Sequence, residues 1–144
     1  MRYVCFGYLD EQKWETMSEA ERNAVLDECF AYDAILRESG HFVGGEGLAS
    51  ARSAITVRYQ GGRVSVTDGP FAETKEQVGG LLFLEAADLN HAVQLISKHP
   101  GVRIGPFEIR PVADMSEMIR ESERRRSGRL REGGGEKPIR SPGR

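Results

Sequence analysis

The chain has 144 residues, a formal net charge of −2 at pH 7, and 39% hydrophobic residues. This length suits one domain with a core large enough to fold without disulfides or a structural metal. No apolar run approaches the ~20 residues that span a bilayer, and Met1 leads into residues 2–6 without a signal sequence. The composition therefore predicts a cytoplasmic protein in which Cys5 and Cys29 are small buried residues.

Charge is distributed unevenly along the chain. Residues 1–119 hold 11 basic and 18 acidic residues, which gives −7, whereas residues 120–144 hold 9 and 4, which gives +5. An arginine-rich tail can neutralise phosphates, but this one lacks the interleaved aromatic residues that stack on bases. We therefore predict a solvated tail and no binding to nucleic acid.

The N-terminal part begins with a predicted strand and a long helix. Aromatic and β-branched residues dominate 2–9, which is typical of a strand. Ser18 and Glu21 form a capping box, which predicts a helix over 18–39. Trp14 lies between these elements and is expected either to anchor the edge of the core or to line a pocket.

A glycine-rich segment and a hairpin follow the helix. Three glycines within 44–47 indicate an irregular backbone, such as a bulge or a close approach by another segment. Residues 53–60 and 63–67 alternate between apolar and polar side chains, and Gly-Gly at 61–62 joins them. This pattern predicts a β-hairpin whose strands are half-buried.

The C-terminal part continues the α+β pattern. The apolar run 81–84 suits a strand in the sheet centre, and Asp88 begins a helix that ends at 99–101. A last strand is predicted at about 105–112, and a helical extension at 114–127. This order predicts an α+β fold close to a ferredoxin-like unit with an added hairpin. If the second face of its sheet is apolar, a symmetric dimer would bury it.

The segment 68–77, with the sequence DGPFAETKEQ, contains more polar and charged residues than a hairpin connection needs. Asp68 ends a strand, and partial shielding by Phe71 would suit a general base. The alternative is a turn-forming aspartate that accepts backbone N–H groups. Glu73 and Lys75 are expected either to position a polar ligand or to belong to a solvated helical turn.

The three histidines are expected to be structural or exposed. His41 directly precedes the glycine-rich segment and is kept as a candidate ligand-binding residue. His99 ends the second helix, where it can contact the last carbonyl groups. No two histidines have metal-binding spacing. The sequence therefore predicts neither a metal nor a cofactor.

Four segments together resemble the YCII-related, DGPF-domain family. They are Gly44–Leu48, Val66–Gln77, Gly79-Gly80 and Glu108–Val112. The long Asp-Gly-Pro-Phe run makes the resemblance specific, and it covers about residues 1–113. We therefore expect a family domain over 1–113, a helical extension over 114–127 and a basic disordered tail over 128–144.

The resemblance implies a ferredoxin-like α+β sandwich with an antiparallel sheet and two main helices. It also implies dimerisation through the sheets, the dimeric α/β-barrel arrangement. The YciI branch of the family implies a His–Asp acid/base pair with its histidine near the start of the first helix, but residues 14–24 contain no histidine. The DGPF branch is associated with sigma-factor-type transcription proteins.

Three functions follow as alternatives. The first is a small-ligand pocket at the 68–77 loop of a homodimer, with acid/base chemistry at Asp68. The second is a non-enzymatic regulatory or binding module that acts with a sigma-factor-type protein partner. The third is a structural dimer in which the loop only closes one end of the barrel. The sequence names neither a substrate nor a ligand.

Overall fold

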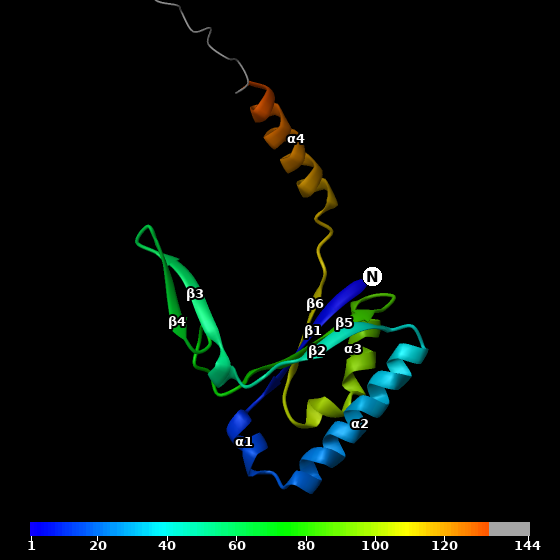
Figure 1. The fold of residues 1–144 in the computed structure, drawn as a ribbon. Helices are drawn as coiled ribbons and strands as arrows, with labels where there is room; N and C mark the ends of the chain where they lie inside the picture. The colour runs from blue at the N-terminus through cyan, green and yellow to red at the C-terminus, as the bar shows by residue number, and fades with distance from the viewer. Residues whose placement is uncertain (133–144) are drawn as a thin grey trace, which may run out of the picture. The chain divides into compact units, whose positions relative to one another are not determined.

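Four strands form one antiparallel sheet in the computed structural model, which describes residues 1–132 (Figure 1). Their order across the sheet is β2-β5-β1-β6, so the first and last strands pair side by side. The strands are β1 (Arg2–Leu9), β2 (Phe42–Gly47), β5 (Gln77–Glu85) and β6 (Phe107–Pro111). The predicted mixed α/β fold with an antiparallel sheet is confirmed, and the apolar run 81–84 lies in a central strand as expected.

Two longer helices, α2 (Glu19–Glu38) and α3 (Leu89–Ser97), pack on one face of this sheet (Figure 1). The predicted capping box of α2 is present, because Glu21 N–H donates to Ser18 Oγ at 3.1 Å and Ser18 N–H donates to Glu21 Oε2 at 3.4 Å. Asp88 caps α3 in a similar way through His91 N–H. Each helix thus begins where a side-chain acceptor satisfies its first N–H groups.

Short helices connect the main elements. The polar stretch after β1 is α1 (Glu11–Thr16), which the sequence did not predict. Its N-cap, Asp10, accepts hydrogen bonds from the N–H groups of the second and third helical residues. Two single 3-10 turns, η1 (Ala51–Ser53) and η2 (Pro100–Arg103), precede β3 and β6.

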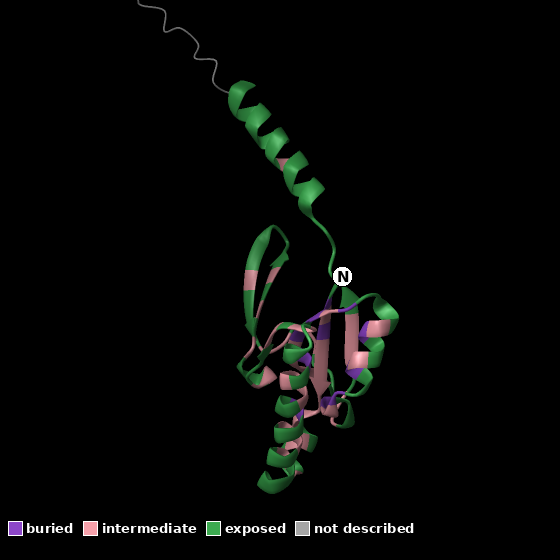
Figure 2. Cartoon of the chain, turned by 90° about the vertical axis from the view of Figure 1, so that its right-hand side faces the viewer, coloured by how far each residue is buried: buried purple, intermediate pink, exposed green. Residues whose placement is uncertain are grey.

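The core lies between the sheet and the two helices. Alternate residues of β1 and β5 point into it, and the register pairs Tyr3 with Leu84 and Cys5 with Leu82. Leu36 of α2 belongs to the same cluster. Figure 2 shows buried positions on strands and helices of this part of the chain. The intervening residues lie on the opposite side of the sheet, which we call the open face; they include Val4, Phe6, Leu81 and Phe83.

The predicted hairpin forms, but the prediction that its strands are half-buried is wrong. Strands β3 (Ile55–Gln60) and β4 (Arg63–Asp68) make a separate two-stranded sheet. It projects from one end of the main sheet, away from α2 and α3 (Figure 1). Its large apolar side chains are 64–74% exposed, because within residues 1–112 the hairpin does not join the core.

The first compact unit ends at Val112, and the second contains one long helix, α4 (Ser116–Glu132). Ion pairs from Glu117 to Arg120 and Arg124 support the helix along one side. It continues through residue 132, so the predicted start of a disordered tail at 128 is wrong for residues 128–132. The rest of that predicted tail, 133–144, lies outside the described residues. Among the described helices, none is both long and apolar enough to cross a membrane.

Replacing Leu84 by alanine should lower the free energy of unfolding by about 2–5 kcal/mol, because this side chain is fully buried between the sheet and the helices. Urea denaturation followed by circular dichroism measures the change. Leu130→Ala is the matched control, since Leu130 is 80% exposed in α4. Its expected effect is within about 0.5 kcal/mol. Equal effects of the two changes would contradict this description of the core.

Candidate functional site

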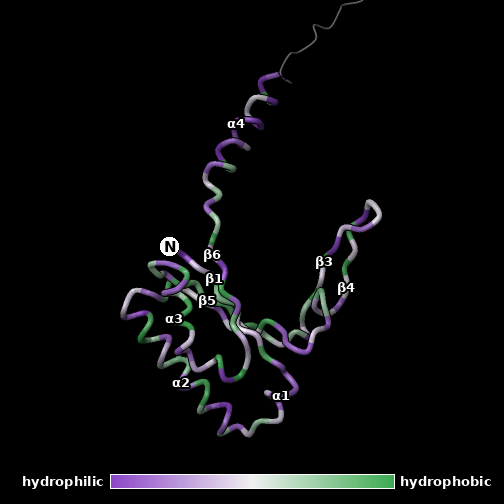
Figure 3. Tube along the Cα trace, turned by 180° about the vertical axis from the view of Figure 1, so that it is seen from behind, coloured by the Kyte–Doolittle hydropathy of each residue, from purple (hydrophilic) through white to green (hydrophobic). Residues whose placement is uncertain are grey.

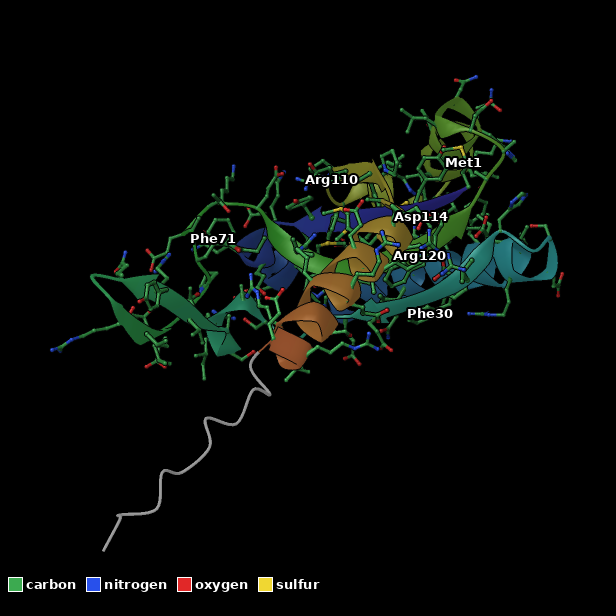
Figure 4. The ribbon with its side chains drawn as sticks, turned by 90° about the horizontal axis from the view of Figure 1, so that it is seen from above. Met1, Phe30, Phe71, Arg110, Asp114 and Arg120 are labelled. Carbon is green, nitrogen blue, oxygen red and sulfur yellow. The ribbon has the colours of Figure 1, made fainter. Side chains whose placement is uncertain are left out.

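The loop after β4 folds back onto one face of the hairpin. Thr56 Oγ1 donates to Gly69 O at 2.7 Å, and an Arg58 guanidinium nitrogen donates to Phe71 O at 2.6 Å. Gly69 has φ = +95°, a left-handed conformation that glycine adopts without strain. The side chains of Asp68 and Phe71 remain exposed, and Figure 4 shows Phe71 beside the hairpin.

Two polar side chains of this loop, those of Gln77 and Thr74, form hydrogen bonds within it. The Gln77 amide donates to Ala72 O at 2.9 Å and to both oxygens of Thr74 at 3.0 and 3.1 Å. Thr74 Oγ1 in turn donates to Glu76 O at 2.6 Å. The side chains of Gln77 and Thr74 therefore hold the loop in its own conformation. Among the described residues, the charged side chains of the segment (Asp68, Glu73, Lys75 and Glu76) take no part in these bonds.

The candidate residues chosen from the sequence do not meet at one place. His41 lies before β2, whereas the hairpin leaves from the other end of that strand, roughly 20 Å away at ~3.3 Å per residue. His41 Nδ1 lies 2.8 Å from Glu85 O, and its ring packs edge-on against His91. The catalytic role predicted for Asp68 and the ligand-binding roles predicted for Phe71, Glu73, Lys75 and His41 stay predictions.

A cleft of about 550 Å³ lies between α2 and the sheet. Its floor is a row of glycines on adjacent strands, where Gly7 of β1 pairs with Gly80 of β5, and Gly80 pairs with Gly47 of β2. Phe107 of β6 pairs with Gly7 at the end of this row. Because three neighbouring positions lack side chains, α2 cannot pack directly on this part of the sheet, and a hollow remains.

Aromatic and aliphatic side chains form most of the cleft's remaining walls. Trp14 of α1 is among them, so of its two predicted roles the pocket wall is the one that the structure supports. Phe30 of α2 is 64% exposed at the same cleft, and Figure 4 shows it far from Phe71. The Arg37 guanidinium stacks over the Phe42 ring at 4.4 Å, a cation–π contact. Among the described lining residues, none belongs to the 68–77 loop.

A histidine–carboxylate pair is the main polar feature of the cleft. His99 Nε2 lies 3.0 Å from Asp33 Oδ1, although the two residues are 66 positions apart in the chain. His99 is buried, and the Asp33 side chain is 23% exposed. Both residues line the cleft. The sequence-based expectation that His99 contacts the last carbonyl groups of its helix is therefore wrong, since the ring turns towards α2.

The backbone of η2 determines which nitrogen of His99 carries the proton. Gly101 N–H donates to Nδ1 at 3.0 Å, so Nδ1 supplies a lone pair and the proton resides on Nε2. Nε2–H then donates to Asp33 Oδ1. Both ring nitrogens are thus occupied, and the second carboxylate oxygen of Asp33 is the group left to meet a ligand.

Tight packing supports the His99 ring from several sides. Tyr32 meets it edge-on with ring centroids 5.6 Å apart, and Phe107 meets it at 5.3 Å. A methyl group on Gly101 would lie 2.9 Å from Nδ1 and 3.1 Å from the Phe107 ring. Only a glycine at 101 therefore lets the backbone approach the imidazole this closely.

Asp33 is the site residue that the sequence analysis missed. It lies four residues after Cys29 and three before Leu36, so it belongs to the buried stripe of α2. A carboxylate in such a stripe usually needs a polar partner. That spacing was the available signal, but it could not identify His99 as the partner.

Both cysteines are buried thiols, as predicted. Burial raises the pKa of Cys5 from an ordinary 9.0 to about 11. Burial also raises the pKa of Cys29, the charge of Asp33 raises it further, and a hydrogen bond from the Gly101 backbone lowers it. Neither thiol is therefore an activated nucleophile. Among the described residues, no cluster of His, Cys, Asp and Glu could hold a metal ion.

Stability should fall as the pH rises from about 9 to 11. The unfolded chain ionises Cys5 near 9, whereas the folded protein keeps this thiol protonated until about 11, so the stabilising difference is lost across that window. Urea unfolding at several pH values, compared between wild type and Cys5→Ala, measures this contribution. The variant should have a shallower pH dependence; identical slopes would contradict burial of this thiol.

Comparison with known proteins identifies a family and includes similarity to one curated protein and to solved structures. The family model for the YCII-related domain matches residues 1–116. An uncharacterised protein of Rhizobium meliloti (strain 1021) is 32% identical over 117 residues, which cover 78% of this chain and 93% of that protein. The solved 5-chloro-2-hydroxyhydroquinone dehydrochlorinase of Burkholderia phenoliruptrix AC1100, in complex with 2,5-dihydroxybenzoquinone, aligns with a TM-score of 0.43 at 12% identity. That alignment covers 78% of this chain and 94% of the enzyme.

Proposed function

The chain belongs to the YCII-related family, and we propose that its glycine-floored cleft binds a small molecule on which Asp33 acts as an acid/base group. The observation that carries this proposal is the contact between Asp33 Oδ1 and His99 Nε2 inside the cleft. A volume of about 550 Å³ falls in the range of small-molecule sites, which are mostly apolar with a few convergent polar groups.

The proposed chemistry is proton transfer at the free oxygen of Asp33. Nε2–H of His99 holds Oδ1, so Oδ2 takes a proton from an acidic C–H or O–H group of the bound molecule. The carboxylate becomes a carboxylic acid, and the ligand becomes the conjugate base. Asp33 then returns the proton to the same or another atom of the ligand. His99 is a positioning residue here, because both of its ring nitrogens are already bonded.

This proposal revises the site expected from the sequence. The YciI branch implied a His–Asp pair with its histidine near the start of the first helix, and residues 14–24 have none. In the proposed site the aspartate comes from α2 and the histidine from the segment after α3. Acid/base chemistry at Asp68 stays a prediction from the residues of the loop, and a sigma-factor-type partner stays a prediction from the resemblance.

Asp33→Asn should abolish proton transfer while leaving the cleft intact, because the amide is isosteric but cannot act as a base. Trp14 is the sole tryptophan of the chain and lines the cleft, so its emission reports ligand entry. A panel of small phenols, carboxylic acids and enolisable carbonyl compounds would be titrated first. Compounds that bind would then be tested for deuterium uptake from D₂O, which should drop about 10²–10⁴-fold in the variant.

Asp27→Asn is the matched control, since Asp27 is an exposed aspartate of the same helix that does not line the cleft. It should match wild type in both assays. If compounds bind but exchange equally well with wild type and Asp33→Asn, the acid/base part of the proposal fails. If none of the panel perturbs Trp14, the ligand-binding part fails for these compound classes.

We also propose that residues 1–112 are a ferredoxin-like sandwich that pairs with a second copy through the open face of the sheet. The strand order β2-β5-β1-β6, with α2 and α3 on one side, supports the first part. The apolar side chains of β1 and β5 on the open face support the second, with the charged Glu108 and Arg110 of β6 beside them at the edge of the sheet. A two-fold axis would bury the same patch on both copies. Among its residues, Phe83 is 37% exposed and Phe6 is half-buried.

Sedimentation equilibrium should find twice the 16.0 kDa chain mass at micromolar concentration. Phe83→Glu should shift the protein towards monomer, since it places a charge in the middle of the apolar open face. Leu89→Glu is the control: Leu89 is 47% exposed but lies on α3, on the other side of the sheet. A wild-type monomer at these concentrations would contradict the proposed dimer.

A further inference from the structure

One side of the β3–β4 hairpin is an exposed apolar surface, which we call the hairpin face. The cross-strand register pairs Val57 with Val66 and Tyr59 with Val64, so these side chains share one side. Ile55 extends the surface towards the start of β3. All five side chains are 64–74% exposed, and Figure 3 shows apolar positions along both strands of the hairpin.

The opposite side of the hairpin is polar and already has a cover. The loop after β4 lies on it through hydrogen bonds from Thr56 to Gly69 O and from Arg58 to Phe71 O. The polar side of the hairpin is thus covered by the loop of the same chain. Within residues 1–112, the hairpin face lacks an equivalent cover.

A two-stranded hairpin alone is marginally stable in water and needs a packed apolar face to persist. Five large side chains gathered on one side are also unusual for a surface that stays in solvent. These two facts indicate that the hairpin face is buried against another surface in the assembled protein.

We propose that this surface belongs to a second copy of the chain, so that each hairpin is an arm that packs against the partner in the homodimer. The inference rests on the dimer proposed above. The hairpin projects away from α2 and α3, towards the side on which the open face lies (Figures 1 and 3). A copy seated on the open face therefore meets the arm.

Symmetry favours a second copy over an unrelated protein. The hairpin face alone is small compared with a standard interface of about 20–30 residues a side. In a two-fold dimer each chain both gives an arm and receives one, so two hairpin faces and two open faces are buried together. A single interface then covers the hairpin face and the open face together.

The test replaces Val57 by lysine and Val66 by glutamate in the full chain. The two positions face each other, so the opposite charges preserve pairing between β3 and β4 while removing the apolar contact. Sedimentation equilibrium should give a dimer dissociation constant raised by about tenfold or more. The matched control is Gln60→Glu with Thr67→Lys, which places the same charges on the polar side of the same hairpin and should leave the constant unchanged.

Hydrogen exchange provides a second measurement on unmodified protein. Amides of residues 55–68 should exchange more slowly as the protein concentration rises through the dissociation constant, because dimerisation covers the arm. In the monomeric Phe83→Glu variant they should exchange quickly at all concentrations. This readout holds even if the charged hairpin variant loses its local structure.

The outcomes distinguish the proposed contact through the hairpin face from the proposed dimerisation itself. A monomeric wild type contradicts both. If the wild type is a dimer and the Val57/Val66 variant has the same dissociation constant, the proposed contact through the hairpin face is contradicted. The proposed dimer through the open face is then unaffected. Equal weakening by the hairpin variant and its polar-side control also overturns the arm, because the effect would then come from charge and not from the hairpin face.

Discussion

The hollow at the centre of this protein depends on three glycines lying side by side across the sheet. Gly47, Gly80 and Gly7 occupy the helix-facing side of β2, β5 and β1 at the same level. Strand register is the constraint behind this row, since a slip of one residue would move each glycine to the other face. With the row in place, α2 has nothing to pack against there, and the cleft remains.

The polar pair in the wall of this cleft is costly to bury, and its hydrogen bonds offset that cost. A buried imidazole and a mostly buried carboxylate need partners on every polar atom that solvent cannot reach. His99 meets this need with Asp33 on one nitrogen and the Gly101 backbone on the other. A charged residue in the buried stripe of a helix conflicts with simple amphipathic patterning, and such conflicts are expected at functional sites.

The loop of residues 68–77 lies on the hairpin, although its composition suggested that it would form a ligand pocket. Gln77 and Thr74 bond within the loop, while Arg58 and Thr56 attach it to the hairpin. These four side chains therefore stabilise the loop and its attachment to the hairpin. The conspicuous motif and the cleft are separate features, one at the hairpin and the other between α2 and the sheet.

Local signals in the sequence were enough to predict several of the helices and strands. The capping box at Ser18 and the N-cap at Asp88 predicted the main helices correctly, and the aromatic and β-branched residues of 2–9 predicted the first strand, because those signals act within a few residues. The resemblance carried by the DGPF segment predicted the family. The candidate site, in contrast, depends on contacts between segments that are distant in the chain. Asp33 and His99 lie 66 residues apart, and their contact exists because the sheet order brings the segment before β6 against α2. The exposure of the hairpin could not be predicted from the sequence either. Alternation predicts which side chains share a face, but not whether another surface covers that face.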